Sequence, residues 1–79
     1  MSERKIIPGG HYRHFKGMIY QVLGTATHTE TNETLVIYQA QYGDFQLYAR
    51  PMEMFLSPVD LEQYPDCKQQ FRFEYIDSY

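Results

Sequence analysis

The sequence predicts a mainly β protein: a small barrel of five short strands, with one helical or 3₁₀ turn before the last strand. Residues 18–27 and 34–42 are rich in Ile, Val, Tyr, Leu and Thr, the residue types that favour strands. Neither segment carries a long apolar stripe at helical spacing. Three shorter segments, in which polar and apolar residues alternate, indicate three further strands.

The two long segments are predicted to form a hairpin with a polar tip. Residues 28–33 read His-Thr-Glu-Thr-Asn-Glu and contain no apolar side chain. Asn32 is the expected pivot, because asparagine tolerates a positive φ. Residues that alternate along a strand share a face, so one face carries Tyr20, Val22, Gly24, Ala26 and His28. We expect the core to receive Val22 from the first strand, with Val36, Tyr38 and Ala40 from the second.

The remaining elements follow from alternation and from turn residues. Residues 10–15 form the first strand, and Gly17 supplies the positive φ of the turn after it. Residues 45–50 form the fourth strand and residues 71–76 the last. Pro51 suits the first position of a helical turn, and the apolar residues after it are spaced i, i+3, i+4: Met52, Phe55 and Leu56.

Five short strands with a helical turn before the last are the layout of an SH3-like barrel. An OB-like barrel is the alternative, but its helix usually falls between the third and fourth strands. At 79 residues the chain forms one domain. We expect this domain to span residues 9–76, between a flexible N-terminal tail at 1–8 and a C-terminal tail at 77–79.

Several spaced motifs resemble those of a family of small bacterial single-domain proteins of unknown function. They are Gly-His-Tyr-Arg-His-Phe-Lys-Gly at 10–17, His-Thr-Glu-Thr-Asn-Glu at 28–33, Tyr-Gly-Asp at 42–44 and Arg-Pro-Met-Glu-Met-Phe at 50–55. The chain departs from the family at Tyr48-Ala49, where members usually carry Trp-Val. Members look like SH3-type barrels, so the resemblance implies that fold. The resemblance implies no activity.

Composition narrows the classes of partner. The formal net charge is −3, which disfavours nucleic acid, because proteins that bind it usually carry a basic face. No segment approaches the roughly 20 apolar residues of a membrane span, and the first residues lack the apolar segment of a signal peptide. We therefore expect a cytoplasmic protein without a membrane partner. The sequence indicates no cofactor and leaves monomer and homodimer open.

The hairpin tip is the first candidate site. A two-residue turn would place Glu30 opposite Glu33, and like charges facing each other destabilise a sheet. A cation is therefore expected nearby: Arg13, Arg50, His28, a metal ion or a ligand. Together with His28, the carboxylates suit a divalent metal such as Zn or Mn, or acid and base catalysis. The alternative is a solvated turn, with Arg13 paired to Glu30 or Glu33 as a structural staple.

An aromatic groove with positive charge at its base is the second candidate. Arg13 offers a planar fork of donors that suits a carboxylate or phosphate. Aromatic grooves bind proline-rich segments, methylated cations or unstacked bases. The alternative is that these aromatic residues belong to the core and rim. The residues expected in the groove are Tyr12, Arg13, His14, Tyr42, Tyr48 and Arg50.

We interpret the chain as a non-catalytic binding module for a small anionic ligand or a protein segment. The hairpin tip, with His28, Glu30 and Glu33, would form the rim of its groove. A metal-dependent or acid/base enzyme that uses these three residues is one alternative. A nucleic-acid module is another, and it predicts one shared face for Arg13, Lys16, Arg50 and Arg72. No catalytic nucleophile is indicated, because Cys67 has no histidine near it in the sequence.

Overall fold

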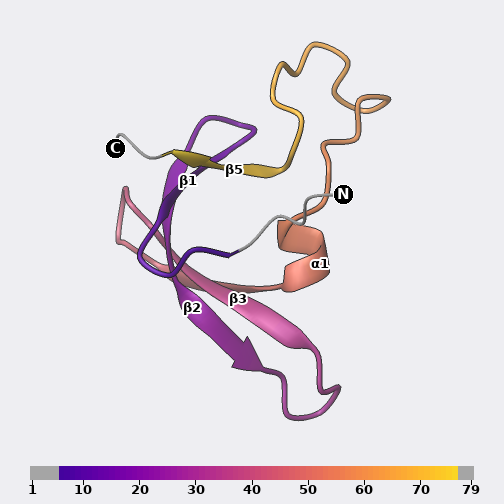
Figure 1. The fold of residues 1–79 in the computed structure, drawn as a ribbon. Coiled ribbons are helices and arrows are strands. Elements are labelled where there is room, and N and C mark those ends of the chain that lie inside the picture. Colours follow the sequence, from indigo (N-terminus) through magenta and orange to yellow (C-terminus); the bar gives the residue numbers. More distant parts are fainter. Residues whose placement is uncertain (1–5, 77–79) are drawn as a thin grey trace.

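The computed structural model describes residues 6–76 and contains five strands and one short helix (Figure 1). The elements are β1 (His11–His14), β2 (Ile19–Thr27), β3 (Thr34–Ala40), β4 (Leu47–Pro51), α1 (Met52–Phe55) and β5 (Phe73–Ile76). All five strands pair antiparallel in one sheet of order β4-β3-β2-β1-β5. The predicted mainly β class, with five strands and one helical turn, is confirmed.

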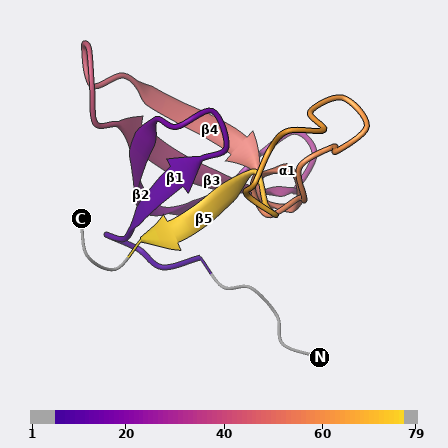
Figure 2. The ribbon, with the colours of Figure 1, turned by 90° about the horizontal axis from the view of Figure 1, so that it is seen from above.

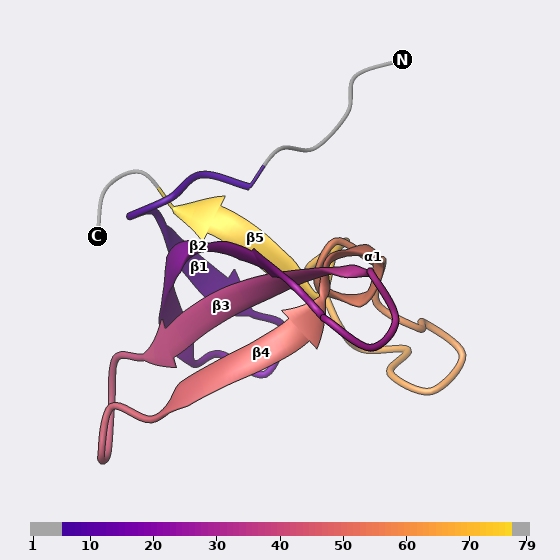
Figure 3. The ribbon, with the colours of Figure 1, turned by 90° about the horizontal axis from the view of Figure 1, so that it is seen from below.

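The sheet is strongly bent, and α1 lies at the end where its two edge strands converge (Figures 2 and 3). The helix packs on β3 and β4. It falls between β4 and β5, which is the position expected for an SH3-like barrel rather than for an OB-like one. The SH3-like assignment itself stays a prediction. Within residues 6–76, no helix is long and apolar enough to cross a lipid bilayer.

The core lies on the concave face of this sheet, against α1. It contains the predicted residues Val22, Val36, Tyr38 and Ala40, all of them buried. Phe55 of α1 is fully buried, and its neighbours Met52 and Leu56 pack against the same cluster, as the helical spacing predicted. The other buried members are aromatic: Tyr12, Tyr20 and Phe73.

A β-bulge in β2 changes the predicted assignment of faces. The register shifts between Val22 and Gly24, so that Thr25, and not Gly24, lies opposite Val36. Ala26 is exposed, which corrects the prediction that it shares the inner face. The physical reason is the extra residue: one insertion into a strand of period two moves every later side chain to the other face. Gly24, with a φ of 157°, lies at this irregularity.

The segment before β1 is packed where the structure describes it. Ile6 lies against the core, and the backbone N–H of Ile7 donates to the Tyr12 hydroxyl at 3.1 Å. Packing therefore begins before residue 9, where the sequence placed the start of the domain. The parts of the two predicted tails at 1–5 and 77–79 lie outside the described residues.

The long loop at 57–72 connects α1 to β5 and stands beside the turn between β1 and β2 (Figure 1). Its two ends are held together, since Val59 N–H donates to Gln70 O at 2.9 Å and Arg72 N–H to Ser57 O at 2.9 Å. Phe15 N–H donates to Arg72 O at 2.9 Å, which ties the loop to the β1–β2 turn. The candidate site lies where this loop meets the β1–β2 turn.

Candidate functional site

The hairpin tip spans residues 28–33, as the sequence predicted, and its two glutamates do not face each other. The last strand pair is Thr27 with Thr34, and His28 N–H donates to Glu33 O at 2.8 Å. Glu33 is therefore opposite His28, while Glu30 lies inside the turn. Asn32 alone among residues 28–33 has a positive φ, 64°, as the prediction of a pivot required. A two-residue type I′ turn would need two such residues, so the tip is not a turn of that type.

Polar side chains of the tip form hydrogen bonds within the turn itself. His28 Nδ1 accepts from Glu30 N–H at 3.1 Å, and the Thr31 hydroxyl donates to a Glu33 carboxylate oxygen at 3.1 Å. Among residues 6–76, no group of three or more His, Cys, Asp or Glu is placed to hold a metal ion. This geometry supports the solvated turn and gives the metal-site hypothesis no support.

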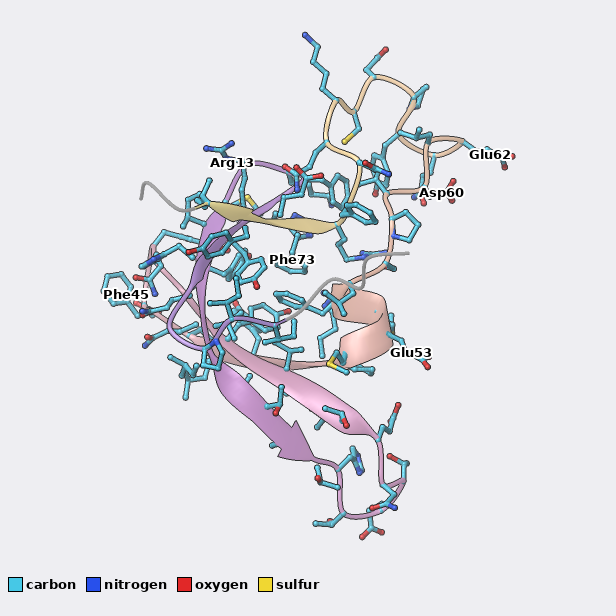
Figure 4. The ribbon with its side chains drawn as sticks, in the orientation of Figure 1. Arg13, Phe45, Glu53, Asp60, Glu62 and Phe73 are labelled. Carbon is cyan, nitrogen blue, oxygen red and sulfur yellow. The ribbon has the colours of Figure 1, made fainter. Side chains whose placement is uncertain are left out.

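Arg13 lies far from this tip. It is exposed on β1, with Ile19 and Glu74 as its strand partners, and Figure 4 shows it at the opposite end of the molecule from the β2–β3 hairpin. Within the described chain it forms no ion pair with Glu30 or Glu33, so the alternative in which Arg13 staples β1 to the hairpin tip is wrong. The prediction that Tyr12 lines the groove is also wrong. Tyr12 is buried in the core, and its ring centroid lies 5.5 Å from that of Phe55.

Three of the predicted groove residues do come together, around two buried tyrosines. The Tyr42 and Tyr20 hydroxyl groups form a hydrogen bond of 2.8 Å, and the Tyr48 ring stacks on Tyr38 at 5.6 Å. Arg50 Nε donates to the Tyr38 hydroxyl at 3.2 Å. Burial raises the pKa of Tyr20, and the hydrogen bond to Tyr42 raises it further. Tyr20 therefore remains protonated at neutral pH, and the tyrosine cluster orients Arg50.

His14 lies at the end of β1, half-buried between aromatic rings. Its ring centroid is 4.5 Å from that of Phe15 and 4.9 Å from that of Phe73. Its Nδ1 atom accepts from Lys16 N–H at 3.1 Å. The pKa of His14 is lowered from 6.5 to about 4, chiefly by burial and then by the charges of Arg50, Arg72 and Lys16. The imidazole is thus neutral at pH 7 and faces several cations.

These cations line one pocket, here called the cationic pocket, with a volume of about 230 Å³. Lys16, Arg50 and Arg72 contribute three positive charges, and Asp60 contributes the single carboxylate. Asp60 accepts from Glu62 N–H at 3.0 Å, and within residues 6–76 no ion pair joins it to the three cations. The other lining residues are His14, Phe15, Val59, Gln63 and Tyr64. Positive charge is therefore in excess in this partly open pocket.

The model of the family of proteins of unknown function DUF1653 matches residues 10–75 of the chain. The chain belongs to the DUF1653 family. The crystal structure of a DUF1653 protein from Bordetella bronchiseptica is similar, with a TM-score of 0.73 and 32% sequence identity. The similarity covers 89% of this chain and 87% of that one. No curated protein matches the chain significantly.

Sequence reasoning found only part of the DUF1653 pocket. Arg50 and His14 were expected in the groove, and Lys16 and Arg72 entered only through the nucleic-acid alternative. Gln63 and Tyr64 were missed, because they lie in the polar loop at 57–72, whose composition carries no periodic pattern. The hydrogen bonds that return this loop to β1 join residues far apart in the sequence, and no local signal indicates them.

We expect His14 to make this DUF1653 domain less stable in acid. Its folded-state pKa is about 4 and its ordinary value 6.5, so the unfolded chain binds more protons between these values. The contribution of neutral His14 is complete above pH 6.5, and the free energy of unfolding should fall as the pH drops towards 4. Urea unfolding at several pH values measures this slope. His14→Gln should flatten it, and His28→Gln, at the hairpin tip, should retain the contribution of His14. An unchanged slope in His14→Gln would contradict this account.

Proposed function

We propose that this DUF1653 domain is a cytoplasmic, non-catalytic binding module that holds an anionic group, a carboxylate or a phosphate, in the cationic pocket. One observation carries the proposal: three cationic side chains from separate parts of the chain line one pocket that has a single carboxylate. Like charges brought together away from bulk water repel one another, and a bound anion relieves that repulsion.

Both arginines are anchored in a way that leaves donors for a ligand. Arg50 uses Nε on the Tyr38 hydroxyl at 3.2 Å, and Arg72 uses Nε on the Ser57 hydroxyl at 3.3 Å. A guanidinium has five N–H donors in a planar fork, so most donors of each side chain remain for an oxyanion. The Arg50 guanidinium also lies over the Phe73 ring, 5.8 Å from its centre.

The lining of the pocket suits binding better than catalysis. It includes no Ser, Thr or Cys that would serve as a nucleophile. His14 Nδ1 is engaged with the Lys16 backbone, and its low pKa keeps the imidazole neutral. The hairpin tip does not belong to this proposal, because His28, Glu30 and Glu33 lie at the other end of the sheet and bond within their own turn.

A nucleic-acid module is the second candidate, and one observation favours it. Lys16, Arg50 and Arg72 share a pocket, as that hypothesis expected, although Arg13 does not join them. The overall charge of −3 and the small size of the pocket argue for a single anionic group instead of a long phosphate backbone. A binding constant that falls steeply with salt would identify the nucleic-acid module.

A ¹⁵N-HSQC titration of the full chain with sodium phosphate, sodium acetate and a short single-stranded oligonucleotide tests both candidates. Under the proposal, phosphate or acetate causes saturable shifts at residues 14–16, Arg50 and Arg72. Residues 28–33 serve as the internal control and should not move. The proposal fails if neither anion produces saturable shifts in the cationic pocket, whatever the oligonucleotide does.

A further inference from the structure

The cationic pocket adjoins a larger one, here called the loop pocket, of about 570 Å³. The loop pocket is formed by Phe15, Lys16 and residues 63–69. Four residues line both pockets: Phe15, Lys16, Gln63 and Tyr64. The two pockets therefore lie side by side, and a ligand that spans them would pass over these shared residues. The volume of the loop pocket lies in the range of roughly 300–1,000 Å³ that is typical of small-molecule sites.

The shared wall is aromatic. The Phe15 and Tyr64 rings meet edge to face at 4.9 Å, and both side chains are half-buried. Lys16 Nζ lies 5.8 Å from the centre of each ring, at the boundary between the two pockets. Aromatic faces with an adjacent cation form a platform on which flat rings stack beside a negatively charged group.

The far side of the loop pocket is polar and held in place. Asp66 and Lys68 are exposed there and provide donors and acceptors for the edge of a ring. Gln69 Nε2 donates to Arg13 O at 2.8 Å and to Phe71 O at 2.9 Å, which fastens the loop to β1. The loop pocket is therefore a feature of the packed fold.

The net charge of the cationic pocket favours a phosphate monoester over a carboxylate. Three cations against one carboxylate leave two positive charges unbalanced in the cationic pocket, and His14 adds none when neutral. A carboxylate would supply one negative charge. A phosphate monoester carries between about 1.5 and 2 negative charges at pH 7 and presents three strong acceptor oxygens. The phosphate monoester therefore matches the pocket more closely.

We propose that the ligand of this domain is a phosphate monoester attached to a planar ring. Its phosphate lies between Lys16, Arg50 and Arg72, and its ring lies in the loop pocket against Tyr64. This inference rests on the proposed function, since the phosphate occupies the same cationic pocket. The shared chemistry is that of a phosphate monoester with an aromatic ring, whether the ring is a nucleobase carried by a ribose or a simple phenyl group.

Isothermal titration calorimetry of the full chain with inorganic phosphate, phenyl phosphate, AMP and adenosine tests the inference. A stacked ring should make phenyl phosphate or AMP bind about 10-fold tighter than inorganic phosphate. Adenosine alone should bind far more weakly than AMP. A preference for AMP over phenyl phosphate would identify the ligand as a nucleotide, and equal affinities would extend it to any aromatic phosphate.

Two variants test whether the ring of the ligand lies against Tyr64. Tyr64→Ala should remove the advantage of phenyl phosphate and AMP over inorganic phosphate, and the readout is the ratio of these affinities, because Tyr64 also lines the cationic pocket. Phe45→Ala, which removes an exposed aromatic residue on the opposite side of the molecule from the loop at 57–72, is the control and should leave all four affinities unchanged (Figure 4). The ligand comparison on the unaltered chain decides the inference even if Tyr64→Ala does not fold.

The experiment distinguishes failure of this inference from failure of the proposed function. If inorganic phosphate binds and neither phenyl phosphate nor AMP binds more tightly, the inference is overturned and the proposed function stands. If none of the phosphates binds and acetate does not bind either, the proposed function is overturned as well. Adenosine that binds as tightly as AMP would overturn the inference, because the phosphate would then contribute nothing.

Discussion

Replacing Phe73 with alanine should lower the free energy of unfolding by about 3–5 kcal/mol. The Phe73 side chain is 1% exposed and stacks on Phe55, with ring centroids 4.1 Å apart and planes within 7°. It also meets the rings of Tyr20, Tyr38 and His14 edge to face. Alanine would leave a cavity at the point where β5, α1 and the sheet meet.

Chemical denaturation followed by far-UV circular dichroism measures this loss. Phe45→Ala is the matched control, because Phe45 is 55% exposed in the turn before β4 and should cost little. Domains of this size have a total stability near the low end of about 5–15 kcal/mol, so Phe73→Ala should be partly unfolded at 25 °C. A loss below about 1 kcal/mol would show that Phe73 is not the centre of the core.

Phe73 also shows why the fold was largely predictable. Alternation of apolar and polar residues placed Phe73 in a strand and also indicated β1 and β4, while the strand-favouring residue types of 18–27 and 34–42 indicated β2 and β3. Such patterns are local consequences of a side-chain period of two. The period of two failed at the bulge near Gly24, because one extra residue in β2 moves the side chains beyond it to the opposite face of the sheet. Asn32 marked the pivot of the turn, but it did not decide which residues of the tip face each other, and Glu33 lies opposite His28 instead of Glu30.

The site was less predictable, for two different reasons. Grouping Tyr12, Arg13 and His14 in one groove ignored the alternation that the strand itself requires: Tyr12 points inward, so Arg13 points outward. The second reason is distance along the chain. The cationic pocket joins the end of β1, Arg50 and the loop at 57–72, and contacts between such separated segments leave no periodic trace in the sequence.

Arg50→Gln should weaken the binding of inorganic phosphate about 10- to 100-fold. Hydrogen bonds from a charged donor to an oxyanion are stronger than neutral ones, and a glutamine side chain would offer neither the charge nor the planar fork. Stability should change little, because the main loss is the single hydrogen bond from Arg50 Nε to the Tyr38 hydroxyl. Arg13→Gln, which changes the net charge equally on an exposed face of β1, is the matched control and should bind phosphate normally.

The pKa of His14 provides an independent readout of the same change, because burial lowers this pKa most and the charge of Arg50 comes next. In the free protein, Arg50→Gln should raise the pKa of His14 from about 4 towards 6.5, as one repelling cation is removed. In the unaltered protein, bound phosphate should raise this pKa too, since an anion stabilises the imidazolium. Histidine ring shifts recorded against pH, with and without phosphate, measure both effects. If phosphate leaves the pKa of His14 unchanged in the unaltered protein while binding elsewhere, the anion does not occupy the cationic pocket.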